Sequence, residues 1–209
     1  MVRMKPMTCA AIILGAGGSS RLGTPKQLVC YKGETLIARS IHNVVATGCS
    51  PVFTVLGANR EEIEAEVNRL PTISVTNENW SDGMGSSISV GIAALLKSDT
   101  TVNAVLITLC DQPLITSQDL RHLIQMFQQG SALIAASEYE HYSQTIRGVP
   151  AVFAAQLFPE LRKLQGSEGA KGIILNHESE TRFLRIPAAA VDLDTTEDYE
   201  LLREIEESE

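Results

Sequence analysis

Residues 8–28 read TCAAIILGAGGSSRLGTPKQL, and the rest of the chain can be interpreted from this stretch. It begins with an apolar run, residues 9–14, that is typical of a buried strand in a parallel sheet. Small residues follow at 15–20, where backbone N–H groups can approach a ligand closely. Arg21 and Lys26 then supply positive charge for a polyphosphate. The stretch predicts a triphosphate-binding loop after a first strand; the alternative is a tight turn that binds nothing.

The composition is that of a chain that can bury a sizeable core. It has 209 residues, 44% of them hydrophobic, which suits one domain. The net charge of −8 argues against non-specific nucleic-acid binding. The sequence contains no run of about 18 apolar residues, so it predicts no membrane span. The four cysteines form no CxxC motif, so we expect reduced, mostly buried thiols. With no signal-peptide pattern at the start, we expect a cytoplasmic protein that binds neither nucleic acid nor membranes.

Strand-like and helical patterns alternate along the chain, which predicts an α/β fold with a mostly parallel sheet and helices on both faces. Strands are expected at 10–14, 51–56, 72–75, 104–109, 133–137, 151–153 and 181–187. Helices are expected at 35–47, 60–70, 86–96, 117–128, 158–165, 168–176 and 195–207, with Ser117 as one N-cap. Ligands of such sheets bind beyond the carboxyl ends of the strands. The segments 15–26, 57–59, 76–81 and 110–113 should therefore converge on one site.

Asp111 follows the most apolar expected strand and is the first candidate metal ligand. A carboxylate at the rim of the sheet, facing a phosphate loop, is well placed for Mg²⁺, which takes one or two carboxylates plus substrate phosphates. The alternative is an aspartate that caps the turn at the strand end.

Asp192 and Asp194 form a second acidic pair, before the last expected helix. Their alternation places both carboxylates on one side of an extended segment, which is compatible with a second metal ligand. Helix capping is the alternative, because Thr195 or Thr196 could cap the helix and acids suit its positive end.

Residues 77–87, NENWSDGMGSS, are a second candidate ligand site. Small residues that open a helix suit an anion or hydroxyl group. Without a ligand, Trp80 would cover the edge of the core and Ser86 or Ser87 would be an N-cap.

Other enzyme classes lack their sequence signals. The histidines form no HExxH, and no GxSxG occurs. The loop at 15–20 lacks the third glycine of the dinucleotide fingerprint, and no acidic residue follows the strand expected at 51–56. Both absences argue against an NAD-binding protein. The loop also differs from the GxxxxGK[ST] P-loop.

Taken together, these segments resemble the MobA-like nucleotidyltransferases, and most closely the molybdenum cofactor cytidylyltransferases. The matching segments are LGAGGSSRLGTPKQ (14–27), NWSDGMGSSI (79–88), CDQP (110–113), RGVPAVF (147–153), GSEGAK (166–171) and DLDTTEDY (192–199). They span nearly the whole chain. The resemblance implies a Rossmann-like three-layer fold in one domain, 1–209, with a nucleotide-binding part at about 8–130 and an acceptor-binding part at about 131–209.

The resemblance also implies Mg²⁺-dependent transfer of a nucleoside monophosphate from a nucleoside triphosphate, with CTP favoured, to a molybdopterin-type acceptor, with release of pyrophosphate. A molybdoenzyme is a possible partner. The implied catalytic residues are Arg21, Lys26 and Asp111. The implied nucleotide-binding residues are Leu14, Gly15, Ala16, Gly17, Gly18, Arg21, Lys26, Asn79, Gly83, Met84 and Ser87. Asp111 with Asp192 or Asp194 would hold the metal, and Arg147, Gly148, Gly169 and Lys171 would face the acceptor.

The chain departs from the family pattern in three places. Two of these places are Gly-Val-Pro at 148–150 and GSEGAK at 166–171. The third is LVCY at 28–31, where well-known members have Leu-Pro-Trp. The last two leave the base and the acceptor open. A guanylyltransferase, a transferase for a sugar phosphate, and a non-catalytic carrier of the molybdenum cofactor are the alternatives.

Overall fold

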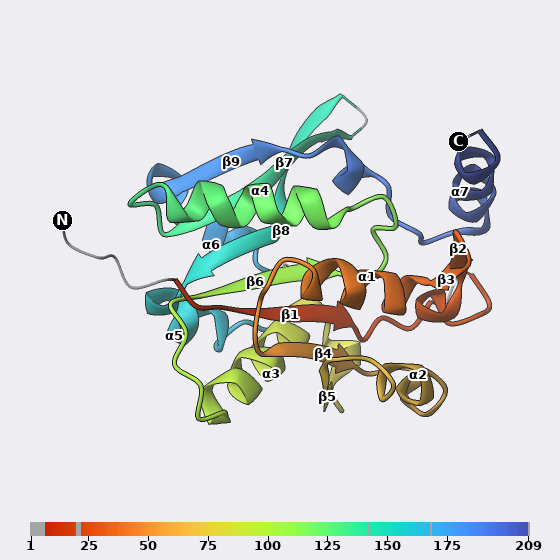
Figure 1. Cartoon of the computed structure of the whole chain (residues 1–209), viewed down its shortest axis with the longest axis horizontal. Coiled ribbons are helices and arrows are strands. Elements are labelled where there is room, and N and C mark those ends of the chain that lie inside the picture. The colour runs from red at the N-terminus through yellow and green to blue at the C-terminus, as the bar shows by residue number, and fades with distance from the viewer. Residues whose placement is uncertain (1–6, 20–21, 142, 168, 209) are drawn as a thin grey trace.

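A seven-stranded sheet in the order β5-β4-β1-β6-β8-β7-β9 forms the centre of the computed structural model (Figure 1), which describes residues 7–19, 22–141, 143–167 and 169–208. The strands are β1 (Cys9–Gly15), β4 (Val52–Leu56), β5 (Ile73–Thr76), β6 (Ala104–Leu109), β7 (Ile134–His141), β8 (Gln144–Ala154) and β9 (Thr181–Arg185). Only β8 runs against its neighbours, β6 and β7; the other strands of this sheet share one direction. The predicted, mostly parallel α/β sheet is confirmed.

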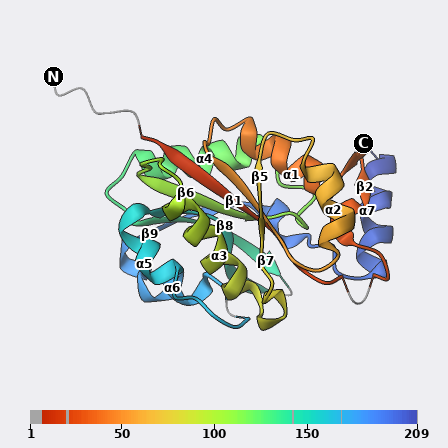
Figure 2. The same ribbon diagram turned by 90° about the horizontal axis from the view of Figure 1, so that it is seen from below.

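Helices cover both faces of the sheet (Figure 2). One face carries α1 (Leu36–Val45), α2 (Arg60–Val67) and α4 (Ser117–Gln128); the other carries α3 (Met84–Lys97), α5 (Phe158–Leu161) and α6 (Lys171–Asn176). Along β1, Ala11 and Ile13 pack on the face that α1, α2 and α4 cover, and Ile12 and Leu14 pack on the opposite face. Because both faces of β1 are buried, its sequence is a continuous apolar run instead of an alternating one.

A small hairpin and the last helix form a third cluster beside the carboxyl ends of the parallel strands. The hairpin consists of β2 (Cys30–Tyr31) and β3 (Glu34–Thr35), and α7 (Thr196–Ser208) lies next to it (Figure 1). Tyr31, Leu36, Leu193 and Leu202 are buried together, and the backbone N–H of Lys32 donates to Glu206 (2.7 Å). The cluster ties the segment before α7 to the chain that follows the first loop.

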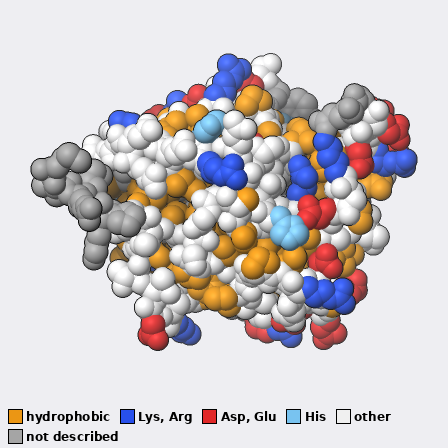
Figure 3. Space-filling view, viewed as in Figure 1, with side chains coloured by type: hydrophobic (Ala, Val, Ile, Leu, Met, Phe, Trp, Pro, Cys, Tyr) orange, Lys and Arg blue, Asp and Glu red, His pale blue; other side chains and the backbone are white. Residues whose placement is uncertain are grey.

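Five short 3₁₀ helices complete the described elements. They are η1 (Lys26–Leu28), η2 (Trp80–Asp82), η3 (Ala155–Leu157), η4 (Glu178–Glu180) and η5 (Pro187–Ala190). On the face shown in Figure 3, acidic and basic side chains are intermixed near the end that carries α7. Within the described ranges, no helix has the length and apolar character needed to cross a membrane.

Two predicted N-caps are wrong. Thr116, and not Ser117, caps α4, because its hydroxyl accepts the N–H of Asp119 while the Asp119 carboxylate accepts the N–H of Thr116. Helix α3 begins at Met84 after Gly83, so Ser86 and Ser87 lie within its first turns and are not N-caps.

The start of α7 agrees with the prediction. The hydroxyl of Thr195 accepts the N–H of Asp198, and the Asp198 carboxylate accepts the N–H of Thr195. Helix α6 begins at Lys171; residue 168, where this helix was expected to start, lies outside the described residues.

Candidate active site

A cavity of about 400 Å³ opens at the carboxyl ends of the central parallel strands. Its walls come from the loop after β1, from η2 and the start of α3, from the end of β6, and from the segment before α7. The lining residues are Leu14, Gly15, Ala16, Gly17, Gly18, Lys26, Gln27, Trp80, Ser81, Gly83, Met84, Ser87, Leu109, Cys110, Asp111, Asp192 and Asp194. Segments far apart in the sequence thus meet beyond the carboxyl ends of the strands, where ligands of such sheets bind.

Most of the predicted nucleotide-binding residues line this cavity: Leu14, Gly15, Ala16, Gly17, Gly18, Lys26, Gly83, Met84 and Ser87. Asn79 instead lines a neighbouring cavity, beside Asn77 and Ser86. Arg21 lies outside the described residues, so its predicted contact with the phosphates stays a prediction.

Gln27 supports the loop after β1, and the sequence predicted no function for it. It is fully buried, and its Nε2 donates to the carbonyl oxygens of Gly15 (2.8 Å) and Gly17 (2.9 Å). The hydroxyl of Ser19 accepts the backbone N–H of Lys26 (2.8 Å) and closes the loop on itself. The only sequence signal for Gln27 was a polar residue directly after the predicted phosphate-binding lysine.

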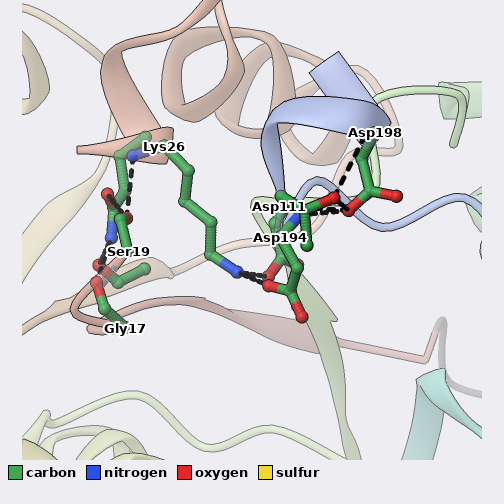
Figure 4. Close-up of polar contacts among 9 residues, drawn as sticks. Gly17, Ser19, Lys26, Asp111, Asp194 and Asp198 are labelled. Atoms are coloured by element: carbon green, nitrogen blue, oxygen red, sulfur yellow. Dashed lines mark hydrogen bonds and ion pairs between the residues drawn. The ribbon is translucent and has the colours of Figure 1, made fainter. Parts of the chain in front are cut away.

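Lys26 joins the first loop to two of the predicted metal ligands (Figure 4). Its Nζ forms ion pairs with Asp111 and with Asp194 (2.6 Å), which lie 85 and 168 positions away in the sequence. Lys26 is only 8% exposed. Burial disfavours its charged form, but the charge of Asp111 and the hydrogen bonds to Asp111 and Asp194 outweigh this and raise the pKa of Lys26 above its ordinary value.

The acidic side of the cavity has unused capacity for a cation. Asp111 Oδ1 is buried and has no hydrogen-bond partner among the described residues. Burial first, and then the negative charge of Asp111, raise the pKa of Asp192 to about 7. Both features mark a place where added positive charge would be favourable. The described residues hold no ready-made group of three or more His, Cys, Asp or Glu side chains for a metal. A magnesium ion here would therefore need phosphate oxygens as well.

Trp80 lies over the first loop, and two glycines make room for it. A Cβ atom at Gly18 would lie 3.0 Å from the indole ring, and one at Gly57 would lie 2.5 Å from Trp80 Cβ. The side chain is 39% exposed and lines the cavity. Trp80 thus covers the loop after β1 and also faces the space where a ligand would bind.

Two of the four predicted acceptor-binding residues line a separate cavity of about 470 Å³. Arg147 and Lys171 lie there with Glu138. Arg147 pairs with Glu138 (2.8 Å) and with Glu178, and its guanidinium lies 4.2 Å from the centre of the Phe183 ring.

The two predicted acceptor glycines differ in their surroundings. Gly148 faces open space, whereas Gly169, at φ +57°, packs so closely on Met84 that a Cβ atom would lie 2.8 Å from the sulfur. Through Met84, Gly169 borders the main cavity. The acceptor role of all four residues stays a prediction.

The chain belongs to the MobA-like NTP transferase domain family, whose model matches residues 11–181. This places it among nucleotidyltransferases of the MobA-like kind and confirms the resemblance to that family. Asp192 and Asp194 lie beyond the matched residues, so their position in the cavity comes from the structure alone.

The similar proteins include one whose name states an oxidoreductase activity. Nicotine blue oxidoreductase of Paenarthrobacter nicotinovorans is 36% identical over 163 residues, which cover 77% of this chain and 78% of that protein. The bifunctional protein GlmU of Rhodococcus opacus (strain B4) is 31% identical over 126 residues, which cover 57% of this chain and 25% of that protein. A crystal structure of the Mycobacterium tuberculosis Rv0371c homologue from Mycobacterium sp. strain JC1 has a TM-score of 0.77 and 28% identity, and the match covers 96% of this chain and 98% of that one.

Proposed function

We propose that this protein transfers CMP from CTP to a molybdopterin-type molybdenum cofactor and releases pyrophosphate. The observation that carries the proposal is the meeting of Lys26, Asp111 and Asp194 at the small-residue loop, in a chain of the MobA-like family. The choice of CTP and of the molybdopterin acceptor rests on the segments that resemble the cytidylyltransferases. A molybdoenzyme that receives the product is the proposed partner.

The side chains of the cavity suit an in-line attack of an acceptor phosphate on the α-phosphorus. The loop at 15–18 would wrap the nucleotide, and Lys26 would neutralise charge on the departing pyrophosphate, together with Arg21. An ionised acceptor phosphate is already a nucleophile, so the protein needs no dedicated base. Positioning and charge stabilisation then supply most of the rate.

The acidic side of the cavity fits Mg²⁺, because Asp111 Oδ1 is buried without a partner among the described residues. Asp111, with Asp192 or Asp194, would hold the ion, which supplies positive charge at the α-phosphate when it is bound.

Pyrophosphate release in the presence of the molybdenum cofactor, with CTP compared with GTP, tests the proposal. We expect release with CTP. Preference for GTP or for a sugar-phosphate acceptor would replace the proposed specificity with that of a related transferase. Binding of the cofactor without consumption of any nucleotide would overturn the transferase and favour a carrier.

Two variants test the residues. Lys26→Ala and Asp111→Ala should each slow turnover by about 10²-fold, because each removes one main charge contact at the transition state. Lys163→Ala, which changes an exposed lysine that does not line the cavity, is the control and should retain the normal rate. A near-normal rate in folded Lys26→Ala or Asp111→Ala protein would contradict the assignment.

A second candidate function comes from the 36% identity to an enzyme named as an oxidoreductase. In this case the same cavity would hold a nucleotide that takes part in a redox reaction. Oxidation of NADH or NADPH with a dye as the electron acceptor, measured by absorbance, tests it. Nucleotide oxidation without pyrophosphate release would favour this candidate over the transferase.

A further inference from the structure

The ammonium group of Lys26 occupies a position that a metal ion would need. Its Nζ contacts one oxygen of Asp111 and Oδ1 of Asp194 (2.6 Å). These are two of the three carboxylates proposed above to hold Mg²⁺. Carboxylate oxygens are the ligands that Mg²⁺ prefers, so the lysine and the metal ion would use the same groups.

Lys26 and a divalent cation therefore compete for these carboxylates. Lys26 is almost entirely buried and the side chain of Asp111 is 17% exposed, so water screens this pair only in part; the side chain of Asp194 is 46% exposed, and its charge is screened more strongly. A cation on Oδ1 of Asp111, which has no hydrogen-bond partner within the described ranges, would still share this carboxylate with the Lys26 ammonium on Oδ2, so the two positive charges would repel each other strongly. While Lys26 remains in this position, we expect the aspartates to bind a divalent cation only weakly.

We expect a second position for the ammonium on the loop side of the cavity. The backbone of Lys26 is fixed, because its N–H donates to Ser19 Oγ (2.8 Å). Its stem extends from the loop toward the aspartates (Figure 4), and its Cε lies 3.7 Å from the place that a Cβ atom on Gly17 would occupy. Because the lysine stem is flexible, rotation of the side chain alone can carry the ammonium from the aspartates to phosphates on the loop.

We propose that Lys26 is a resident counter-ion that keeps a divalent cation away from Asp111 and Asp194 until a nucleoside triphosphate arrives. The phosphates then draw the ammonium to the loop, and the freed carboxylates take the cation. Lys26 thereby couples binding of the nucleotide to binding of the metal. The role of the triphosphate rests on the proposed function, whereas the exclusion of the cation by Lys26 does not.

Binding of Mn²⁺ alone, measured by loss of the electron paramagnetic resonance signal of free Mn²⁺, tests the exclusion directly. Lys26→Met keeps the length of the stem and removes the charge, so it should bind Mn²⁺ at least about tenfold more tightly than the natural protein. Lys26→Arg keeps the charge and should bind as weakly as the natural protein. Lys163→Met removes an exposed lysine and controls for the change in net charge. Thermal melting with and without Mn²⁺ shows that each variant is folded and supplies a second measure of binding.

The same titrations with a non-hydrolysable CTP analogue test the coupling. After subtraction of the Mn²⁺ that the analogue binds without protein, the analogue should tighten Mn²⁺ binding to the natural protein by at least about tenfold and should have a smaller effect on Lys26→Met. The double variant Lys26→Met/Asp111→Asn should lose the gain, which would locate the ion at Asp111. Lys26→Met that binds Mn²⁺ no more tightly than the natural protein would overturn the proposal. Failure of the transferase assay combined with tighter Mn²⁺ binding by Lys26→Met would overturn the proposed function and leave the competition standing.

Discussion

Replacing Gln27 with methionine tests whether one buried side chain holds the loop after β1. Methionine keeps the length of the side chain but removes the donors to Gly15 O (2.8 Å) and Gly17 O (2.9 Å). Each lost hydrogen bond contributes about 1 kcal/mol net, so the free energy of unfolding should fall by about 2 kcal/mol. For a chain of this size, that corresponds to a decrease in Tm of about 4–8 °C.

Thermal melting followed by circular dichroism measures this effect, with Gln128→Met as the control. Gln128 ends α4 and is exposed, so its replacement should leave Tm unchanged. Gln27→Met should also weaken binding of a CTP analogue by about tenfold, because the loop would no longer be held in one conformation before the ligand arrives. A decrease in Tm under about 1 °C, with unchanged nucleotide binding, would refute the role of Gln27.

Three further predictions concern the core, the thiols and the acidic cluster. Gly91→Ala should lower the free energy of unfolding by about 1–3 kcal/mol in urea denaturation, because the added Cβ would lie 2.7 Å from Ile12 Cγ2; an unchanged midpoint would show that α3 can move away from the sheet. Cys30 alone should react rapidly with Ellman's reagent, because the other three cysteines are buried and burial raises the pKa of Cys110 to about 12; a second fast thiol would contradict this. In metal-free protein, Asp192 has a pKa of about 7, so between about pH 4 and 7 the folded state keeps a proton that the unfolded state has released, and stability should fall as pH rises through this range. Asp192→Asn should lose this component of the pH dependence in denaturation measured with EDTA, and parallel curves for the two proteins would contradict the shifted pKa.

The layers of the fold could be predicted because the apolar patterns are strong. The bounds of β6 and α4 agree with the expected 104–109 and 117–128, since each is a long apolar or amphipathic run with clear ends. The reversed direction of β8 could not be predicted, because an apolar run buried on both faces looks the same in either direction. The hairpin of β2 and β3 has only two residues in each strand, too few for any periodicity.

The candidate site was predicted where residue type alone indicates chemistry. Lys26 and Asp111 stood out as a cation after small residues and an acid after a strand, and the rule that ligands bind beyond the carboxyl ends of the strands placed them at one edge. Lys26 pairs with Asp111 and Asp194 only because packing across the whole chain brings them together. No local sequence pattern predicts such a contact. Gln27 and the clearance at Gly57 for Trp80 are likewise visible only once the loop and η2 lie together.

The small cluster beside the carboxyl ends of the sheet has a consequence for how the protein is made. Lys26 is synthesised before Asp194, which lies 168 positions further along the chain. The cluster that positions Asp194 needs Leu193 and Leu202 against Tyr31 and Leu36. A ribosome-bound chain that stops before this segment emerges would have a sheet and a loop but an incomplete site. We expect such nascent chains to have Asp111 beside Lys26 before Asp194 joins them, so that the two carboxylate partners of Lys26 are assembled in separate steps.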